Sequence, residues 1–291
     1  MTARVSFARR ARGPAVAVAW IVAFTVLGAA ASYGVTKVPL HPDPRWWLAW
    51  SSVATVLGFG LATWIVGRVL DHRSWEALGW RPRTGVPRGL LLGIGAGAVM
   101  AATAVVLAVA GGRAAVTARG AWAAIGWTWT TAAVPLGVGF LLAALTEELM
   151  FRGYPLRRLA DAVGTGPATA IVGLGFALAH LGNPNATAFS TVNVGLAGVW
   201  LAAAFFSPGA MPLAWGAHFG WNATLALGFA APVSGYAFPL PALEYRPGPH
   251  QWIDGGAFGP EGGIVATLVT LAGTAGLVAW SRRARGAEAA S

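Results

Sequence analysis

Residues 131–159 read TAAVPLGVGFLLAALTEELMFRGYPLRRL, and this stretch carries the strongest indication of the fold. Its first 16 residues are uncharged, and two adjacent glutamates, Glu147 and Glu148, then interrupt the apolar pattern before Arg152. A bilayer core about 30 Å thick requires about 20 mostly apolar residues per helix. The stretch therefore predicts a membrane-spanning helix that carries ionisable side chains.

Seven further apolar runs flank this stretch. They lie near residues 14–34, 46–70, 86–110, 165–181, 186–206, 211–230 and 262–280. The composition agrees, because 56% of the residues are hydrophobic and only 10% are charged, whereas about 25% are charged in soluble domains. The mean hydropathy is +0.61. We therefore predict an all-α fold, a polytopic membrane helix bundle with about eight transmembrane helices.

The basic residues indicate the orientation of the bundle. With the N-terminus inside, 15 of the 20 fall in cytoplasmic segments, as the preference of Lys and Arg for the cytoplasmic side requires. This predicts an N-in/C-in protein, and it explains the net charge of +10 without a nucleic-acid partner. The first run also resembles a signal peptide, but its length favours a retained signal-anchor. Only Lys37 is a lysine, which favours a GC-rich bacterial genome and hence a bacterial plasma membrane.

The chain divides into three predicted parts. Residues 1–130 hold the first three transmembrane helices and a cytoplasmic loop, and residues 131–231 hold four helices that form the candidate catalytic core. Residues 232–291 hold a long outer loop, which could be a lid or a connector, followed by the last helix and a basic tail.

Few ionisable side chains lie well inside the apolar runs. They are Glu147, Glu148, His180 and His218. A charged side chain at the bilayer centre costs at least about 2.5–3.5 kcal/mol, so a functional role is the default interpretation. Glu148 and Arg152 are four residues apart and can pair on one helix face, whereas Glu147 is rotated by about 100° and stays free.

Two further pairs have the same four-residue spacing. Phe176 and His180 share a helix face, so the ring can pack beside the imidazole. His218 and Asn222 direct two donors toward one point, which is what an oxyanion requires. Taken singly, each group could instead serve only in a helix-helix hydrogen bond or an ion pair.

The sequence lacks the residues that other classes of intramembrane protease require. The chain has no cysteine and no His-Glu-x-x-His, Gly-x-Gly-Asp or Gly-x-Ser-Gly motif, which argues against zincin, aspartyl and serine-type intramembrane proteolysis. What remains is a water activated by Glu147, assisted by His180, that attacks a carbonyl whose oxyanion is held by His218 and Asn222. These residues predict a glutamate-dependent peptidase.

The order Glu-Glu-x-x-x-Arg (147–152), Phe-x-x-x-His (176–180) and His-x-x-x-Asn (218–222) resembles the CAAX-protease and bacteriocin-processing (CPBP, or Abi) family of intramembrane endopeptidases. The resemblance implies that Glu147 and His180 activate water and that His218 and Asn222 stabilise the oxyanion. It also implies supporting roles for Glu148 and Arg152, and we add Phe176 to these. We expect no cofactor; if zinc is bound, the ligands would be Glu147, His180 and His218.

The implied substrate is a membrane-associated protein or peptide, with prenylated C-termini, bacteriocin or peptide precursors and membrane-anchored proteins as candidates. Two other functions stay open: a scaffold or immunity-type binding protein without proteolytic activity, and a proton-coupled transporter. One geometric problem also remains. His180 lies more than about 20 Å from the start of its helix while Glu147 lies near mid-membrane, so the fifth helix must be tilted, displaced or begin later.

Overall fold

The computed structural model describes residues 13–38, 43–118, 125–238, 240 and 243–289. Each of the eight predicted apolar runs forms a helix. They are α2 (Pro14–Thr36), α3 (Trp47–Ala62), α4 (Val86–Ala110), α5 (Ile125–Glu148), α7 (Thr165–Ala179), α8 (Ala188–Phe205), α9 (Ala210–Ala223) and α11 (Ile264–Ala289). The all-α polytopic bundle is thereby confirmed.

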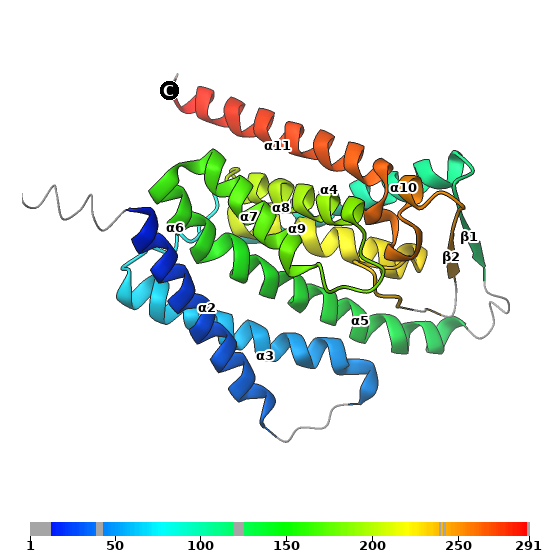
Figure 1. The fold of residues 1–291 in the computed structure, drawn as a ribbon, viewed down its shortest axis with the longest axis horizontal. Coiled ribbons are helices and arrows are strands. Elements are labelled where there is room, and N and C mark those ends of the chain that lie inside the picture. Colours follow the sequence, from blue (N-terminus) through cyan, green and yellow to red (C-terminus); the bar gives the residue numbers. More distant parts are fainter. Residues whose placement is uncertain (1–12, 39–42, 119–124, 239, 241–242, 290–291) are drawn as a thin grey trace, which may run out of the picture.

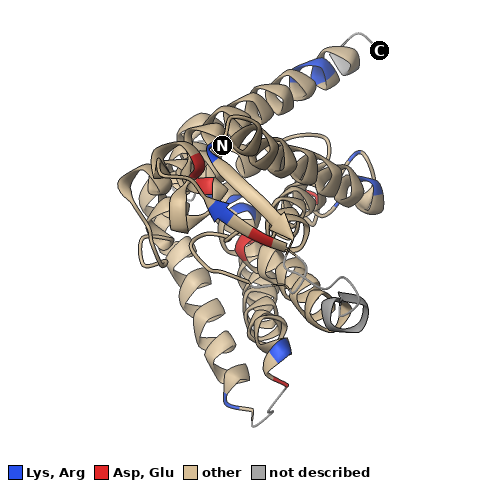
Figure 2. Ribbon diagram, turned by 90° about the vertical axis from the view of Figure 1, so that its right-hand side faces the viewer, with Lys and Arg blue, Asp and Glu red and all other residues tan. Residues whose placement is uncertain are grey.

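Three of these helices continue beyond their α-helical part. The extensions are the π-helical segments η2 (Thr63–Leu70) after α3, η4 (Leu149–Gly153) after α5 and η5 (Thr224–Gly228) after α9, and α6 (Tyr154–Val163) follows η4. Within the described residues, six helices are long and apolar enough to cross a membrane, and α7 is a shorter apolar helix of 15 residues. Charged residues are sparse along the helices in Figure 2. The chain is therefore an integral, multi-pass membrane protein.

The helices are arranged in layers around α5. In Figure 1, α5 lies between the α2–α3 pair and a group formed by α4, α8 and α9, and α11 covers the far side of that group. The start of α2 and the end of α11 lie toward the same end of the bundle, which agrees with termini on one side of the membrane. The side on which they lie remains a prediction.

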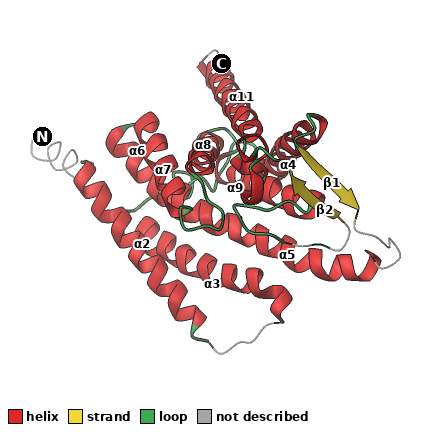
Figure 3. Cartoon of the chain, turned by 45° about the vertical axis from the view of Figure 1, so that its right-hand side comes forward, coloured by secondary structure: helices red, strands yellow, loops and turns green. Residues whose placement is uncertain are grey.

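The opposite end of the bundle carries a small sheet that the sequence did not indicate. Strand β1 (Ala114–Ala118) pairs antiparallel with β2 (Leu243–Pro247), so two loops far apart in the chain join (Figure 3). The segment after β2 contains α10 (Gln251–Asp254), η6 (Gly256–Phe258) and η7 (Pro260–Gly262), and η1 (Pro44–Trp46) precedes α3. The end of the long loop contacts the bundle, because η7 packs against α8 and Asn193 of α8 donates hydrogen bonds to the carbonyls of Glu261 and Gly263.

Glycines allow α4 to approach α9, the helix that carries His218 and Asn222. A Cβ at Gly97 would meet the backbone of α9, including the nitrogen of Trp221 at 2.8 Å, whereas a Cβ at Gly95 would meet nothing within 4 Å. Gly97 is therefore required for close packing, and Gly95 is a matched control on the same helix.

We expect Gly97→Ala to lower the free energy of unfolding by about 1–3 kcal/mol, because an added methyl forces α4 and α9 apart. Gly95→Ala should be neutral or slightly stabilising, since alanine favours a helix. Thermal unfolding in detergent measures both. Equal melting temperatures for the two variants would contradict this account of the packing.

Candidate active site

A helical hairpin places Glu147 and His180 at a similar depth in the bundle. The chain reverses at Gly164, whose φ of +90° is a conformation that glycine adopts readily. Glu147 lies 17 residues before this glycine and His180 lies 16 residues after it. The helix that follows begins at Thr165, as predicted, but the preceding one runs to Val163 rather than Leu159. The longer preceding helix accounts for the unexpected depth of His180.

Glu148 lies at the centre of a buried ionic group. Its Oε1 accepts a hydrogen bond from Arg152 Nη1 at 3.1 Å, as the four-residue spacing predicted, and both side chains are fully buried. His218 Nδ1 lies 2.8 Å from the same oxygen. Arg152 Nη2 also donates to the carbonyl of Gly198, at 3.4 Å. Glu148 therefore links α5 to α9 and fixes the orientation of the His218 ring.

The glutamate pair lies where the helix changes its winding. The α-helical part of α5 ends at Glu148, and the π-helical segment η4 runs from Leu149 to Gly153. Such a segment inserts a residue into the helical repeat, and π-helical turns are frequent at functional sites. Here the π-helical segment η4 lies between the two glutamates and the start of α6.

Phe176 packs between the ionic group and His180. Its ring centroid lies 4.2 Å from the guanidinium carbon of Arg152 and 4.5 Å from the His180 ring, and it also approaches His218 at 6.1 Å. The ring therefore restricts the rotation of His180, as the shared helix face predicted. It also covers the guanidinium with an aromatic face, which is a favourable cation-π contact.

In each of the two histidines, a hydrogen-bond acceptor beside Nδ1 determines which ring nitrogen carries the proton. His180 Nδ1 lies 2.8 Å from the carbonyl oxygen of Phe176, which can only accept, so this nitrogen carries the proton. His218 Nδ1 likewise carries a proton, because it faces the carboxylate of Glu148, which accepts the hydrogen bond. In the neutral ring, the lone pair of each histidine is therefore on Nε2.

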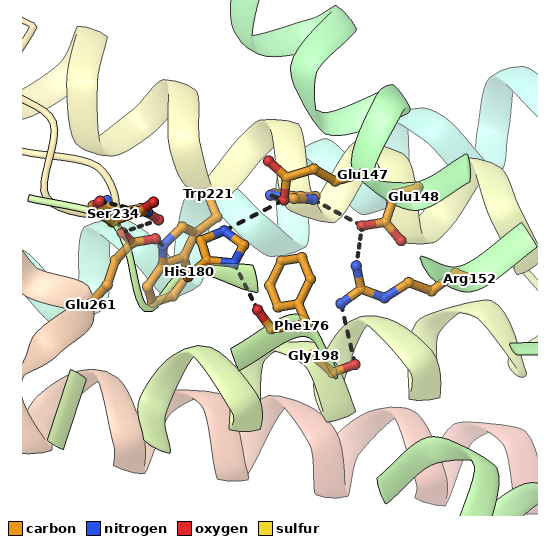
Figure 4. Close-up of polar contacts among 11 residues, drawn as sticks. Glu147, Glu148, Arg152, Phe176, His180, Gly198, Trp221, Ser234 and Glu261 are labelled. Atoms are coloured by element: carbon orange, nitrogen blue, oxygen red, sulfur yellow. Dashed lines mark hydrogen bonds and ion pairs between the residues drawn. The ribbon is translucent and has the colours of Figure 1, made fainter. Parts of the chain in front are cut away.

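Both Nε2 atoms face Glu147. Its Oε2 lies 3.8 Å from Nε2 of His180 and 3.7 Å from Nε2 of His218, which is too long for direct hydrogen bonds. This oxygen is buried and has no hydrogen-bond partner in the described part of the chain. Within the residues described, Glu147 Oε2 is thus held only by these two long ion-pair contacts, and Figure 4 shows the one with His180.

These groups line a common cavity. Glu147, His180, His218 and Asn222 all contribute to its wall, so the structure brings together the four residues predicted to be catalytic. Apolar residues of α8 form another part of the wall, among them Val194 and Leu201. Polar groups at one end and an apolar wall at the other are typical of a ligand site.

The sequence analysis missed one carboxylate of this cavity. Glu261, in η7, lines it and accepts a hydrogen bond from Trp221 Nε1 at 2.8 Å. The backbone N–H of Ser234 and its hydroxyl donate to the other oxygen. The residue lies directly before the last apolar run, where it was assigned to the loop. A carboxylate that borders an apolar run was the only available indication.

Glu147, His180 and His218 are candidate zinc ligands, but their side chains are not arranged to coordinate a zinc ion. The described residues contain no cluster of three or more His, Cys, Asp or Glu side chains suited to a metal ion. Glu147 and the two Nε2 atoms could only become ligands if their side chains moved, because Zn–N and Zn–O distances are about 2.0–2.2 Å. Asn222, beside His218, is a hydrogen-bond donor and is not among the usual zinc ligands.

Comparison with known protein families identifies part of the chain. Residues 128–224 match the family model described as "Type II CAAX prenyl endopeptidase Rce1-like". This segment contains the four residues Glu147, His180, His218 and Asn222, whereas Glu261 lies beyond it. No curated protein and no solved structure gives a significant match to the chain.

Proposed function

We propose that the chain hydrolyses a peptide bond of a membrane-associated protein or peptide by a glutamate-dependent mechanism. The match of residues 128–224 to the CAAX endopeptidase family model and the six apolar helices support this proposal. The observation that carries it is Glu147 Oε2, which makes no hydrogen bond in the described part of the chain and faces the Nε2 atoms of His180 and His218 in one cavity.

In the proposed mechanism, Glu147 and His180 bind the attacking water together. The water donates one hydrogen to Glu147 Oε2 and the other to His180 Nε2, whose lone pair is free because Nδ1 is protonated. Glu147 takes its proton as the oxygen attacks the carbonyl carbon, and then returns it to the leaving nitrogen. One C–O bond forms, one C–N bond breaks, and the products are a carboxylic acid and an amine.

The oxyanion is held by His218 and Asn222 in this proposal. Asn222 offers an amide N–H, but His218 can donate from Nε2 only as the imidazolium, because Nδ1 already donates to Glu148. Glu148 therefore has a defined role: its carboxylate stabilises a positively charged His218 at the point where negative charge develops on the substrate.

Hydrolysis in water enriched in oxygen-18 tests this function. Purified protein is incubated with membrane-anchored peptides in detergent or vesicles, and the products are analysed by mass spectrometry. We expect a new C-terminus that carries one heavy oxygen atom. The same preparation with Glu147→Gln controls for contaminating peptidases. Wild-type protein that leaves such peptides intact across a broad library would count against the proposal.

We also expect cleavage to persist after exhaustive dialysis against a chelator, because the residue beside His218 is an amide donor rather than a metal ligand. Zinc content by elemental analysis, measured on the same sample, should be well below one ion per chain. Loss of activity that stoichiometric zinc restores would instead assign Glu147, His180 and His218 as ligands.

A further inference from the structure

His180 lies at the end of its helix rather than inside it. Helix α7 ends at Ala179, and His180 is the residue that caps it, with a φ of −100° and a ψ of 0°. Its carbonyl oxygen accepts a hydrogen bond from the backbone N–H of Asn183 at 3.1 Å, in the turn that follows. The helix therefore fixes His180 from one side only, and the position of this residue also depends on what holds the turn.

The long outer loop holds this turn. Asn183 Nδ2 donates a hydrogen bond to the carbonyl oxygen of Ser234 at 2.9 Å, across 51 residues of the chain. Beside this bond the two backbones are in close contact, because a Cβ on Gly235 would overlap the carbonyl oxygen of Pro184. Gly235 also has a φ of +88°, which glycine adopts without strain. A hydrogen bond and a backbone contact thus join the turn after His180 to the outer loop.

Ser234 is itself held to the wall of the cavity. It lies in a tight turn that an antiparallel bridge closes between residues 233 and 236. Its φ of +49° is uncommon for a residue other than glycine. In this conformation the N–H and the hydroxyl of Ser234 both donate to Glu261, which accepts a further hydrogen bond from Trp221 Nε1. Ser234 therefore links the turn after His180 to helix α9.

This link does not require a charge on Glu261. Burial raises the pKa of its carboxyl group, and the hydrogen bonds from Ser234 and Trp221 oppose the rise. The neutral acid still has oxygen lone pairs that accept hydrogen bonds, as the carboxylate does. Glu261 can therefore hold Ser234 and Trp221 in either protonation state.

The outer loop also contacts the aromatic ring beside His180. Phe258, in η6, is buried in one cluster with Phe176, whose ring packs on the imidazole. Figure 4 shows Ser234 and Glu261 on one side of His180 and Phe176 on the other. The loop thus approaches His180 both through the turn that follows it and through the ring that covers it.

We propose that Asn183 is a positioning residue for His180, and that it acts through its hydrogen bond to Ser234 of the outer loop. This inference rests on the proposed peptidase function, in which Nε2 of His180 binds the attacking water. Asn183 does not bind the water; it holds the turn that keeps the imidazole opposite Glu147. The outer loop is then a fixed part of the active site and not only a connector between α9 and α11.

Three variants of one turn test this inference. Asn183→Asp removes the N–H that binds Ser234, and Asn183→Ala does so without adding a charge. For both, we expect kcat to fall by about 10–100-fold while KM changes by less than about twofold, because a misplaced group slows the chemical step without weakening substrate binding. Asn185→Asp is the matched control, since Asn185 is exposed and its hydrogen bond to the carbonyl of Ala257 is 3.5 Å long. It should keep the wild-type kcat.

A second background separates positioning from a general loss of structure. Asn183→Ala introduced into His180→Ala protein should lower kcat further by less than about twofold, because a residue that acts through the imidazole has no effect once the imidazole is gone. The same factor in both backgrounds would overturn the inference, as would a wild-type kcat in the Asn183 variants. Thermal unfolding verifies that each variant is folded.

Ser234→Gly provides a milder change if the Asn183 variants do not fold. Glycine suits the positive φ at this position, and the substitution removes only the hydroxyl that binds Glu261. It should lower kcat and leave KM unchanged. A wild-type kcat in this variant would also overturn the inference.

A spectroscopic readout separates this inference from the proposed function. In protein labelled with nitrogen-15 at its histidines, the ring signals of His180 are assigned by their loss in His180→Ala. They should shift or broaden in Asn183→Ala, whereas those of His218 should not. If they do so although the wild type cleaves no peptide, the positioning stands and the peptidase proposal fails. If the wild type cleaves, and Asn183→Ala changes neither these signals nor kcat, the peptidase proposal stands and the role of Asn183 fails.

Discussion

Replacing Glu147 with glutamine should lower kcat/KM by about 10²–10⁴-fold, the contribution typical of a positioned general acid–base group. Glutamine keeps the size of the side chain but cannot take a proton from water. The loss should appear in kcat, because the group acts on the water rather than on substrate binding. Cleavage of a membrane-anchored peptide, followed by mass spectrometry, measures it.

The fold of this variant should be unchanged. Glu147 Oε2 makes no hydrogen bond in the described part of the chain and contacts the two histidines only at 3.7 and 3.8 Å, so the melting temperature should stay close to the wild-type value. The exposed residue Glu76 supplies the matched control, and Glu76→Gln should cleave normally. Undiminished cleavage by a folded Glu147→Gln protein would exclude this residue as the base.

The local part of the site could be predicted from the sequence. Residues four apart in a helix lie on one face, and this rule alone predicts the contact between Glu148 and Arg152 and the packing of Phe176 on His180. It also leaves Glu147 outside the pair formed by Glu148 and Arg152. Eight apolar runs likewise predict the helices, because helix length is set by the thickness of the bilayer.

The contacts between distant segments could not be predicted in this way. His218 and Glu148 are separated by 70 residues, and the hydrogen bond between them fixes which nitrogen of the ring is protonated. Glu261 lines the cavity from η7 and accepts a hydrogen bond from Trp221 of α9, 40 residues earlier in the chain. The pairing of β1 with β2 is of the same kind. Such contacts depend on how helices pack, and no spacing within one segment encodes them.

Replacing Arg152 with methionine should have the largest effect on stability. Glu148 would then remain at 0% side-chain exposure without its guanidinium partner. Loss of one partner from a buried ion pair costs about 3–5 kcal/mol. Glu148 would keep only its hydrogen bond from His218 Nδ1. Phe176 would also lose its cation-π contact. We expect a large fall in melting temperature and a reduced yield of folded protein.

Two comparisons show whether the buried charge causes this loss. Arg157, five residues further on, has a half-exposed side chain paired with Asp161, so Arg157→Met should cost at most about 1 kcal/mol. The double variant Glu148→Gln with Arg152→Met removes both charges and should recover part of the stability lost in Arg152→Met alone. It should not recover cleavage, because His218 Nδ1 would no longer donate to the carboxylate of Glu148. If the double variant were as unstable as Arg152→Met, the arginine would act through packing rather than through charge.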